Sequence, residues 1–195
     1  MDDLAAFVEA LDAGPIDLMG HSRGGHVALR LALRAPQILR RLILAEPGGF
    51  PDASFGTVDG LDPERTARWL REAVRHIESG DIDGGLALFI DGVSGIPMWS
   101  QTIPSFKRMV RDNAHTLLGQ IRETRMAFSR PQLESLEIPN LLVGGALTPS
   151  PFPQLLDLMQ AHLPQVQRVT IAGARHAMNL AAPPAFNTAV LDFLR

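Results

Sequence analysis

The chain has 195 residues, of which 46% are hydrophobic, and its formal net charge at pH 7 is −3. This length and composition are typical of one soluble globular domain with room for an inserted subdomain. The weak net charge and the lack of a basic cluster argue against nucleic acid or a membrane surface as a partner. The absence of cysteine excludes disulfides, thiol catalysis and cysteine-ligated metals.

The N-terminus begins Met1-Asp2-Asp3, with acids where a secretory signal would carry lysine or arginine. No apolar run approaches the roughly 18 residues that are needed to span a bilayer. We therefore expect a soluble cytoplasmic protein.

The first fifty residues alternate between helical and strand-like patterns. Apolar residues recur at helical spacing over 3–13 and 24–35, and a proline follows each stretch closely. Short apolar runs at 16–20 and 41–45 are typical of buried strands. The order helix, strand, helix, strand indicates parallel strands that are joined by helical crossovers.

The middle of the chain has helical patterns and no convincing strand. Helices are expected over 63–79, 81–92 and 104–128. Asp62 and Pro63 together form a typical helix start. We interpret residues 51–135 as an all-helical cap that is inserted into the α/β core.

The strand and helix alternation returns in the last third of the chain. Strands are expected at 140–144 and 168–172, and helices at 152–162 and 184–194. Residues 1–50 and 136–195 therefore form the predicted core. The predicted fold class is α/β, with about four parallel strands, flanking helices and the helical cap.

A candidate nucleophile lies where the first predicted strand meets the second helix. Gly20-x-Ser22-x-Gly24 matches the nucleophile elbow, a strained strand-to-helix turn that needs small residues on both sides of the serine. The alternative is that the glycines only form a turn and that Ser22 only caps the helix. The strand before it and the helix after it favour the elbow.

A serine nucleophile needs a general base, and histidine is the usual one. Of the six histidines, His176 follows a predicted strand and a short turn, at the carboxyl end of a parallel sheet where catalytic groups collect. Structural or surface roles are expected for the other five. No metal-ligand spacing such as HExxH occurs, so we predict no metal site and no cofactor.

Two segments resemble the α/β-hydrolase superfamily, in its serine hydrolases with a helical cap. They are Gly-His-Ser-Arg-Gly-Gly at 20–25 and Ala-Gly-Ala-Arg-His-Ala-Met-Asn at 172–179, followed by Pro183 and Phe186. The resemblance implies that Ser22 is the nucleophile and that His176 is the catalytic histidine. It also implies that the backbone N–H of Arg23 is one oxyanion donor.

The acid of the triad departs from the family's commonest pattern. That pattern places an aspartate in the loop after the strand at 141–144, but this loop contains no carboxylate and has Thr148 at about the expected position. Asp157 lies well inside the next helix. Some family members take the acid from the end of the strand after the elbow, which here is Glu46. The alternative is that Glu46 is a surface carboxylate in a turn.

The resemblance covers the C-terminal two-thirds of such an enzyme. Family members ordinarily have about four strands before the helix that opens this chain, so we expect an N-terminally truncated chain. The second oxyanion donor would then lie outside it. The edge of the first strand would be exposed, which lowers stability and offers a surface for self-association.

The chemistry implied is cleavage of an acyl bond in a small-molecule carboxylic ester. We expect the substrate pocket to include His21, Trp99, Phe106 and Met109. The alternatives are acyl transfer to another acceptor, or cleavage of carbon–carbon or amide bonds by the same triad. A further alternative is that the chain is a non-catalytic remnant or a partner-binding module.

Overall fold

A computed structural model describes residues 2–123 and 126–195. The chain divides into two compact units, which we call the core unit (Met1–Leu61 with Met126–Arg195) and the helical unit (Asp62–Arg125). Residues 51–61 and 126–135, which the sequence assigned to the cap, therefore belong to the core unit.

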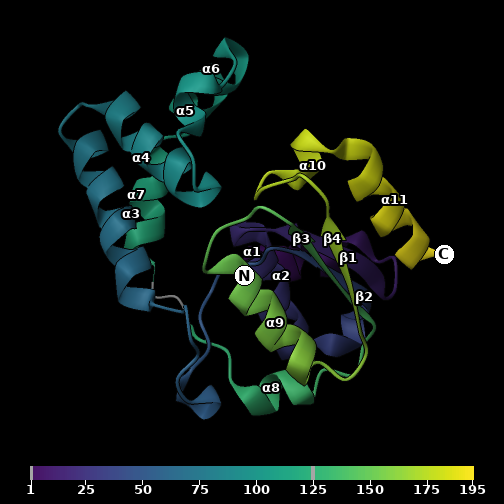
Figure 1. Cartoon of the computed structure of the whole chain (residues 1–195). Helices are drawn as coiled ribbons and strands as arrows, with labels where there is room; N and C mark the ends of the chain where they lie inside the picture. The colour runs from purple at the N-terminus through teal and green to yellow at the C-terminus, as the bar shows by residue number, and fades with distance from the viewer. Residues whose placement is uncertain (1, 124–125) are drawn as a thin grey trace. The chain divides into compact units, whose positions relative to one another are not determined.

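Four parallel strands form the sheet of the core unit (Figure 1), in the order β1-β2-β3-β4. The strands are β1 (Ile16–His21), β2 (Leu39–Ala45), β3 (Asn140–Gly145) and β4 (Val166–Ile171). The first two were predicted from apolar runs, and the last two from strand-like stretches at 140–144 and 168–172. Because all four run in the same direction, their carboxyl ends meet at one edge of the sheet, where the first two strands pair through His21 and Ala45.

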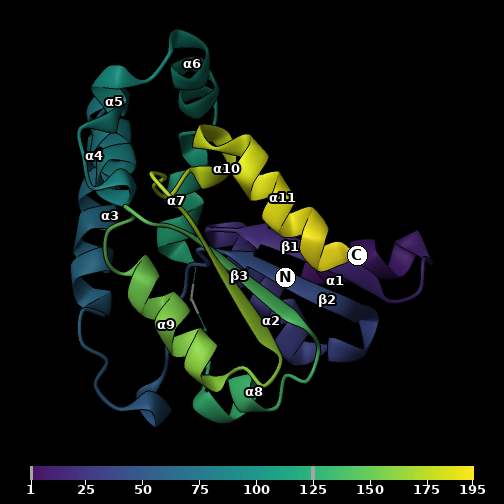
Figure 2. The same cartoon turned by 45° about the vertical axis from the view of Figure 1, so that its right-hand side comes forward.

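Helices cover both faces of this sheet (Figure 2). Alternate residues of β2 point to opposite faces, so Leu42 and Leu44 pack with α2 (Arg23–Arg34) and α9 (Phe152–His162). Ile43 lies in the other apolar cluster, to which α11 (Pro183–Leu194) contributes Phe186. A parallel sheet needs this two-sided cover, and each fully buried leucine contributes about 1.5–3 kcal/mol.

Shorter elements complete the core unit. They are α1 (Asp2–Leu11), η1 (Pro36–Ile38), η2 (Ala53–Phe55), α8 (Arg130–Glu134) and α10 (Met178–Ala181). Among the described residues, β1 and β4 are the edge strands of the sheet. Self-association through the edge of β1 stays a prediction.

The helical unit contains α3 (Pro63–Glu78), α4 (Ile82–Ser94), α5 (Met98–Gln101), α6 (Pro104–Asp112) and α7 (His115–Arg122). Leu70, Val74 and Leu86 pack in its core. As predicted, α3 begins at Asp62 and Pro63, and the Asp62 carboxylate accepts the backbone N–H of Arg65 at 2.9 Å.

The helical stretch predicted over 104–128 is divided between α6 and α7 and does not extend to Phe128. The Asn113 side chain donates a hydrogen bond to the Met109 carbonyl at 2.8 Å, and α6 ends there. The last residue of that range, Phe128, is fully buried in the core unit and forms an isolated parallel bridge with Pro51. None of the helices in the described ranges is long and apolar enough to cross a membrane.

Candidate active site

Ser22 lies in a strained turn between the end of β1 and the start of α2. Its φ of 54° and ψ of −121° place a non-glycine residue in a sparsely populated region, at a cost of order 1–3 kcal/mol. Three backbone hydrogen bonds hold the turn, because Ser22 donates to Ala45 and accepts from both His26 and Gly48. This is the local geometry that a nucleophile elbow requires.

The glycines around Ser22 have different roles. A Cβ atom on Gly20 would lie 2.4 Å from the Gly24 carbonyl oxygen, and one on Gly25 would lie 2.9 Å from the Cα atom of Pro47. A Cβ atom on Gly24 would meet nothing within 4 Å. The sequence pattern assigned the steric requirement to Gly20 and Gly24, and the structure moves the second requirement to Gly25.

These contacts predict opposite effects for two glycine substitutions. Gly20→Ala should lower the free energy of unfolding by roughly 1–3 kcal/mol, because backbone atoms occupy the space of the new methyl group. Gly24→Ala should raise it by about 0.5–1 kcal/mol, because alanine is favoured over glycine in a helix. Urea denaturation measures both variants, and an equal loss in the two would contradict the assignment.

His176 lies next to Ser22. It follows β4 through the turn at Gly173, which has a φ of 68°, and its side chain is buried. The Nε2 atom of His176 is 2.9 Å from the Ser22 Oγ atom. With the proton of the neutral imidazole on Nδ1, the Ser22 hydroxyl donates to Nε2, which is the arrangement of a nucleophile and its general base.

Glu46 completes a chain of hydrogen bonds. It directly follows β2 with a φ of 41°, and it is only 1% exposed. Its Oε2 atom is 2.7 Å from His176 Nδ1, and its Oε1 atom accepts the backbone N–H of Gly145 at 2.7 Å. Both oxygens of a buried carboxylate are thus satisfied, which burial of such a group requires.

The loop that most often carries the family's acid lies close to the same sheet edge but contributes no acid. Thr148 in this loop is buried, and its hydroxyl has no hydrogen-bond partner among the described residues. Asp157, the nearest carboxylate along the chain, pairs with Arg168. Of the acids that the sequence offered, Glu46 is therefore the one that contacts His176.

The sequence reasoning missed two supports of His176. The Phe152 ring stacks on the His176 ring, with centroids 4.1 Å apart. A Cβ atom on Gly145 would lie 2.6 Å from the Ala174 carbonyl oxygen, so a glycine allows the loop before His176 to pass close to β3. In the sequence, the pair Gly144-Gly145 at the end of an apolar run was the feature that could have indicated this close approach.

The predicted pocket residues do not all belong to one unit. Trp99 lies on α5 of the helical unit, while Phe106 and Met109 lie on α6. The Trp99 ring packs under the ammonium group of Lys107, at 5.0 Å from the ring centroid. Contact between these side chains and a substrate stays a prediction. His21, the fourth predicted pocket residue, contacts His176 directly, with ring centroids 4.7 Å apart.

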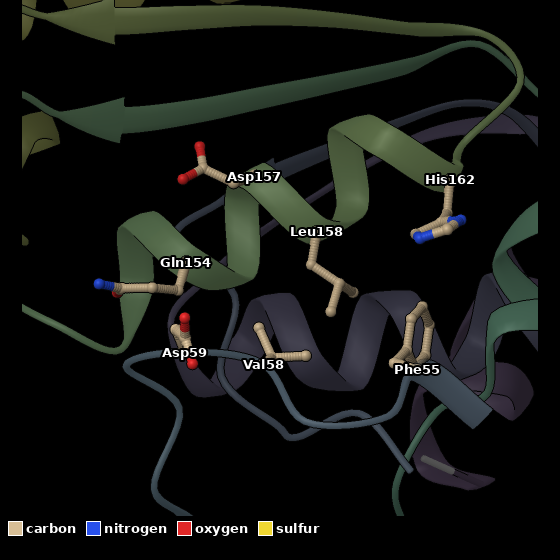
Figure 3. Close-up of a pocket in the computed structure, with 7 residues that line it drawn as sticks. All are labelled: Phe55, Val58, Asp59, Gln154, Asp157, Leu158 and His162. Carbon is tan, nitrogen blue, oxygen red and sulfur yellow. The ribbon is translucent and has the colours of Figure 1, made fainter. Parts of the chain in front are cut away.

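A cavity of about 360 Å³ lies elsewhere on the core unit. Leu158 of α9 points toward Val58 and Phe55 across it (Figure 3). Its lining consists of Phe55, Val58, Asp59, Gln154, Asp157, Leu158 and His162. None of the residues that surround Ser22 contributes to it, so this cavity is separate from the candidate active site.

Comparison with known proteins shows which family the fold belongs to. The sequence model of a family described as "Alpha/beta hydrolase family" matches residues 1–189. The chain is 26% identical over 208 residues to a putative carbamate hydrolase RutD of Agrobacterium fabrum, with 99% of this chain and 72% of that protein covered. It is 27% identical over 211 residues to a pimeloyl-(acyl-carrier protein) methyl ester esterase of Neisseria meningitidis, with 98% and 75% covered.

A solved structure is similar over the whole chain. It is a thermophilic esterase from Thermogutta terrifontis with malate bound, which superposes with a TM-score of 0.70 at 26% identity. The superposition covers 100% of this chain and 70% of that one. The chain thus spans about seven tenths of the length of these relatives.

Proposed function

The chain belongs to the alpha/beta hydrolase family, and we propose that it is a serine hydrolase that cleaves carboxylic esters through Ser22, His176 and Glu46. The observation that carries the proposal is the chain of two hydrogen bonds from Glu46 through His176 to Ser22, at 2.7 and 2.9 Å. All three side chains belong to the core unit.

Each residue has one task in the proposed reaction. The Ser22 Oγ atom attacks the ester carbonyl carbon while His176 Nε2 takes the hydroxyl proton, and the carbonyl electron pair moves onto oxygen. Collapse of this tetrahedral intermediate breaks the bond to the alcohol oxygen, which receives the proton from His176. Water then attacks the acyl-enzyme in the same way, releasing the acid and restoring Ser22.

Glu46 acts on the histidine rather than on the substrate. Its Oε2 atom accepts the Nδ1–H of His176, which leaves Nε2 free of a proton and able to act as a base. In the intermediates the same carboxylate faces the positive charge of the imidazolium. The Gly145 N–H fixes the other carboxylate oxygen, so the orientation of the acid is set by the backbone of β3.

The oxyanion needs a donor beside Ser22. Arg23 directly follows Ser22 and is the first residue of α2, so its backbone N–H belongs to a helix N-terminus, where partial positive charge favours an anion. We assign it as an oxyanion donor. Removal of one such donor typically costs about 100- to 1,000-fold in turnover.

Two relatives support an ester as the substrate. One is named as a methyl ester esterase and one as a thermophilic esterase. Another is named as a putative carbamate hydrolase, which also cleaves an acyl bond. Esters of small or medium apolar acids are therefore the first substrates to examine, and matched amides and carbamates are the comparison.

The proposal predicts covalent labelling of the chain by a fluorophosphonate probe. Attack of Ser22 Oγ on phosphorus should form one phosphonate ester with loss of fluoride, and p-nitrophenyl butyrate should be hydrolysed. Intact-mass and peptide mass spectrometry locate the label. Ser22→Ala should neither be labelled nor hydrolyse the ester. No label on a wild-type chain that circular dichroism shows to be folded would overturn the proposal and favour a non-catalytic role.

A further inference from the structure

His21 links the segment that carries Ser22 to the segment that carries His176. It is the last residue of β1 and directly precedes Ser22. Its Nε2 atom is 2.8 Å from the backbone carbonyl oxygen of His176. Because a carbonyl oxygen only accepts, His21 Nε2 carries the proton and donates this hydrogen bond.

The topology of the sheet places Ser22 and His176 after strands that are not neighbours. Ser22 follows β1 and His176 follows β4, which are the two outer strands among those described. With neighbouring strands about 4.8 Å apart, three spacings separate them by roughly 14 Å. The contact of 2.9 Å between Ser22 and His176 therefore depends on how the segment after β4 is held.

Different contacts hold different parts of that segment. Leu147 donates its backbone N–H to the Ala174 carbonyl at 2.9 Å, and the Arg175 guanidinium donates to the Leu147 carbonyl at 2.8 Å. Both contacts anchor the segment to the loop after β3. The hydrogen bond from His21 anchors the backbone of His176 itself, and it does so from the residue beside the nucleophile.

We propose that His21 is a positioning residue, whose neutral imidazole donates to the His176 carbonyl and holds the catalytic imidazole in line with Ser22. This role rests on the proposed function. It differs from the substrate-pocket role that the sequence predicted, because His21 acts through His176 and not on the substrate.

The charge of His21 also affects His176, because the two rings are in contact. Burial lowers the pKa of His21 and the neighbouring His176 lowers it further, while the hydrogen bond to the His176 carbonyl and the charge of Glu46 act in the opposite direction and are outweighed. His21 is therefore neutral at pH 7 and gains a proton only below its ordinary pKa of about 6.5. A proton on His21 would oppose the imidazolium that forms on His176 during the reaction.

The inference predicts a difference between two variants of His21. His21→Phe keeps a ring but removes the donor, so kcat and the rate of fluorophosphonate labelling should both fall about 100-fold with KM nearly unchanged. His21→Gln keeps an N–H donor and should recover most of both rates. His115→Phe, on the exposed first residue of α7, is the control for the loss of a histidine.

The pH profile gives a readout that a packing role would not change. The wild-type kcat/KM should fall at acid pH with a limiting slope on logarithmic axes that is about one unit steeper than in His21→Gln, because protonation of His21 places a positive charge beside His176. In His21→Gln the slope should be about one. Unfolding by urea, followed for each variant, shows which of them keep the fold.

The tautomer can be measured without activity. Histidine ¹⁵N NMR of the wild-type chain, assigned with His21→Gln, should show His21 neutral and protonated on Nε2 at pH 7. An Nδ1–H tautomer, a charged ring, or His21→Phe with wild-type rates would overturn the inference. A change confined to KM would overturn it in favour of substrate contact. Absence of labelling in the wild type would instead overturn the proposed function, and the positioning role of His21 with it.

Discussion

Replacing Glu46 with glutamine should lower the kcat of ester hydrolysis about 10⁴-fold with little change in the fold. Glutamine has the shape of glutamate, and its carbonyl oxygen can still accept the Gly145 N–H that Glu46 Oε1 now accepts at 2.7 Å. The amide NH₂ group then faces His176 Nδ1. An amide donor there favours the tautomer with the proton on Nε2, which cannot accept the proton of Ser22.

Asp157→Asn is the matched control for this measurement. Asp157 is the carboxylate nearest along the chain to the loop that usually carries the acid, but it is exposed and pairs with Arg168. Steady-state kinetics with p-nitrophenyl butyrate should therefore give the wild-type kcat for this variant. Wild-type turnover in Glu46→Gln would show that Glu46 is not the orienting acid.

The parts of the fold that the sequence predicted are those with a local cause. The inner strands β2 and β3 contain short apolar runs, because both faces of a parallel sheet are covered. The strained turn at Ser22 was predictable because strand, turn and helix follow one another directly along the chain. The position of His176 was predictable because it follows the last predicted strand, and its motif resembles that of a known family.

The parts that the sequence did not predict depend on contacts between distant segments. The crowding at Gly25 comes from Pro47, and the N–H that orients Glu46 comes from Gly145. The hydrogen bond from His21 ends on a residue 155 positions away. No periodicity along the chain encodes these pairs, because the packing of the sheet creates them.

Local chemistry also overrode a periodic pattern once. The apolar residues over 104–128 repeat at helical spacing, but the Asn113 side chain bonds the Met109 carbonyl where α6 ends. The buried Phe128 at the end of that range packs in the core unit instead. Asparagine competes with the helix backbone for hydrogen bonds, so it was a signal for a break that the periodicity concealed.

Ser22→Ala and His176→Ala should each lower kcat by about 10⁶-fold, and the double variant should lose no more than either one. The reason is the contact of 2.9 Å between His176 Nε2 and Ser22 Oγ. A base without its nucleophile has no proton to take, and a serine without its base is a weak nucleophile at neutral pH. The two side chains therefore act as one unit.

Steady-state kinetics of the two single variants and the double variant separates this expectation from two independent contributions. If each residue acted alone on the transition state, the losses would multiply in the double variant. His162→Ala is the control, since His162 is a partly buried histidine of the core unit that pairs with Glu134 at 3.1 Å, and it should keep the wild-type kcat. Multiplied losses would show that Ser22 and His176 do not share one proton transfer, and the proposed mechanism would then be wrong at its first step.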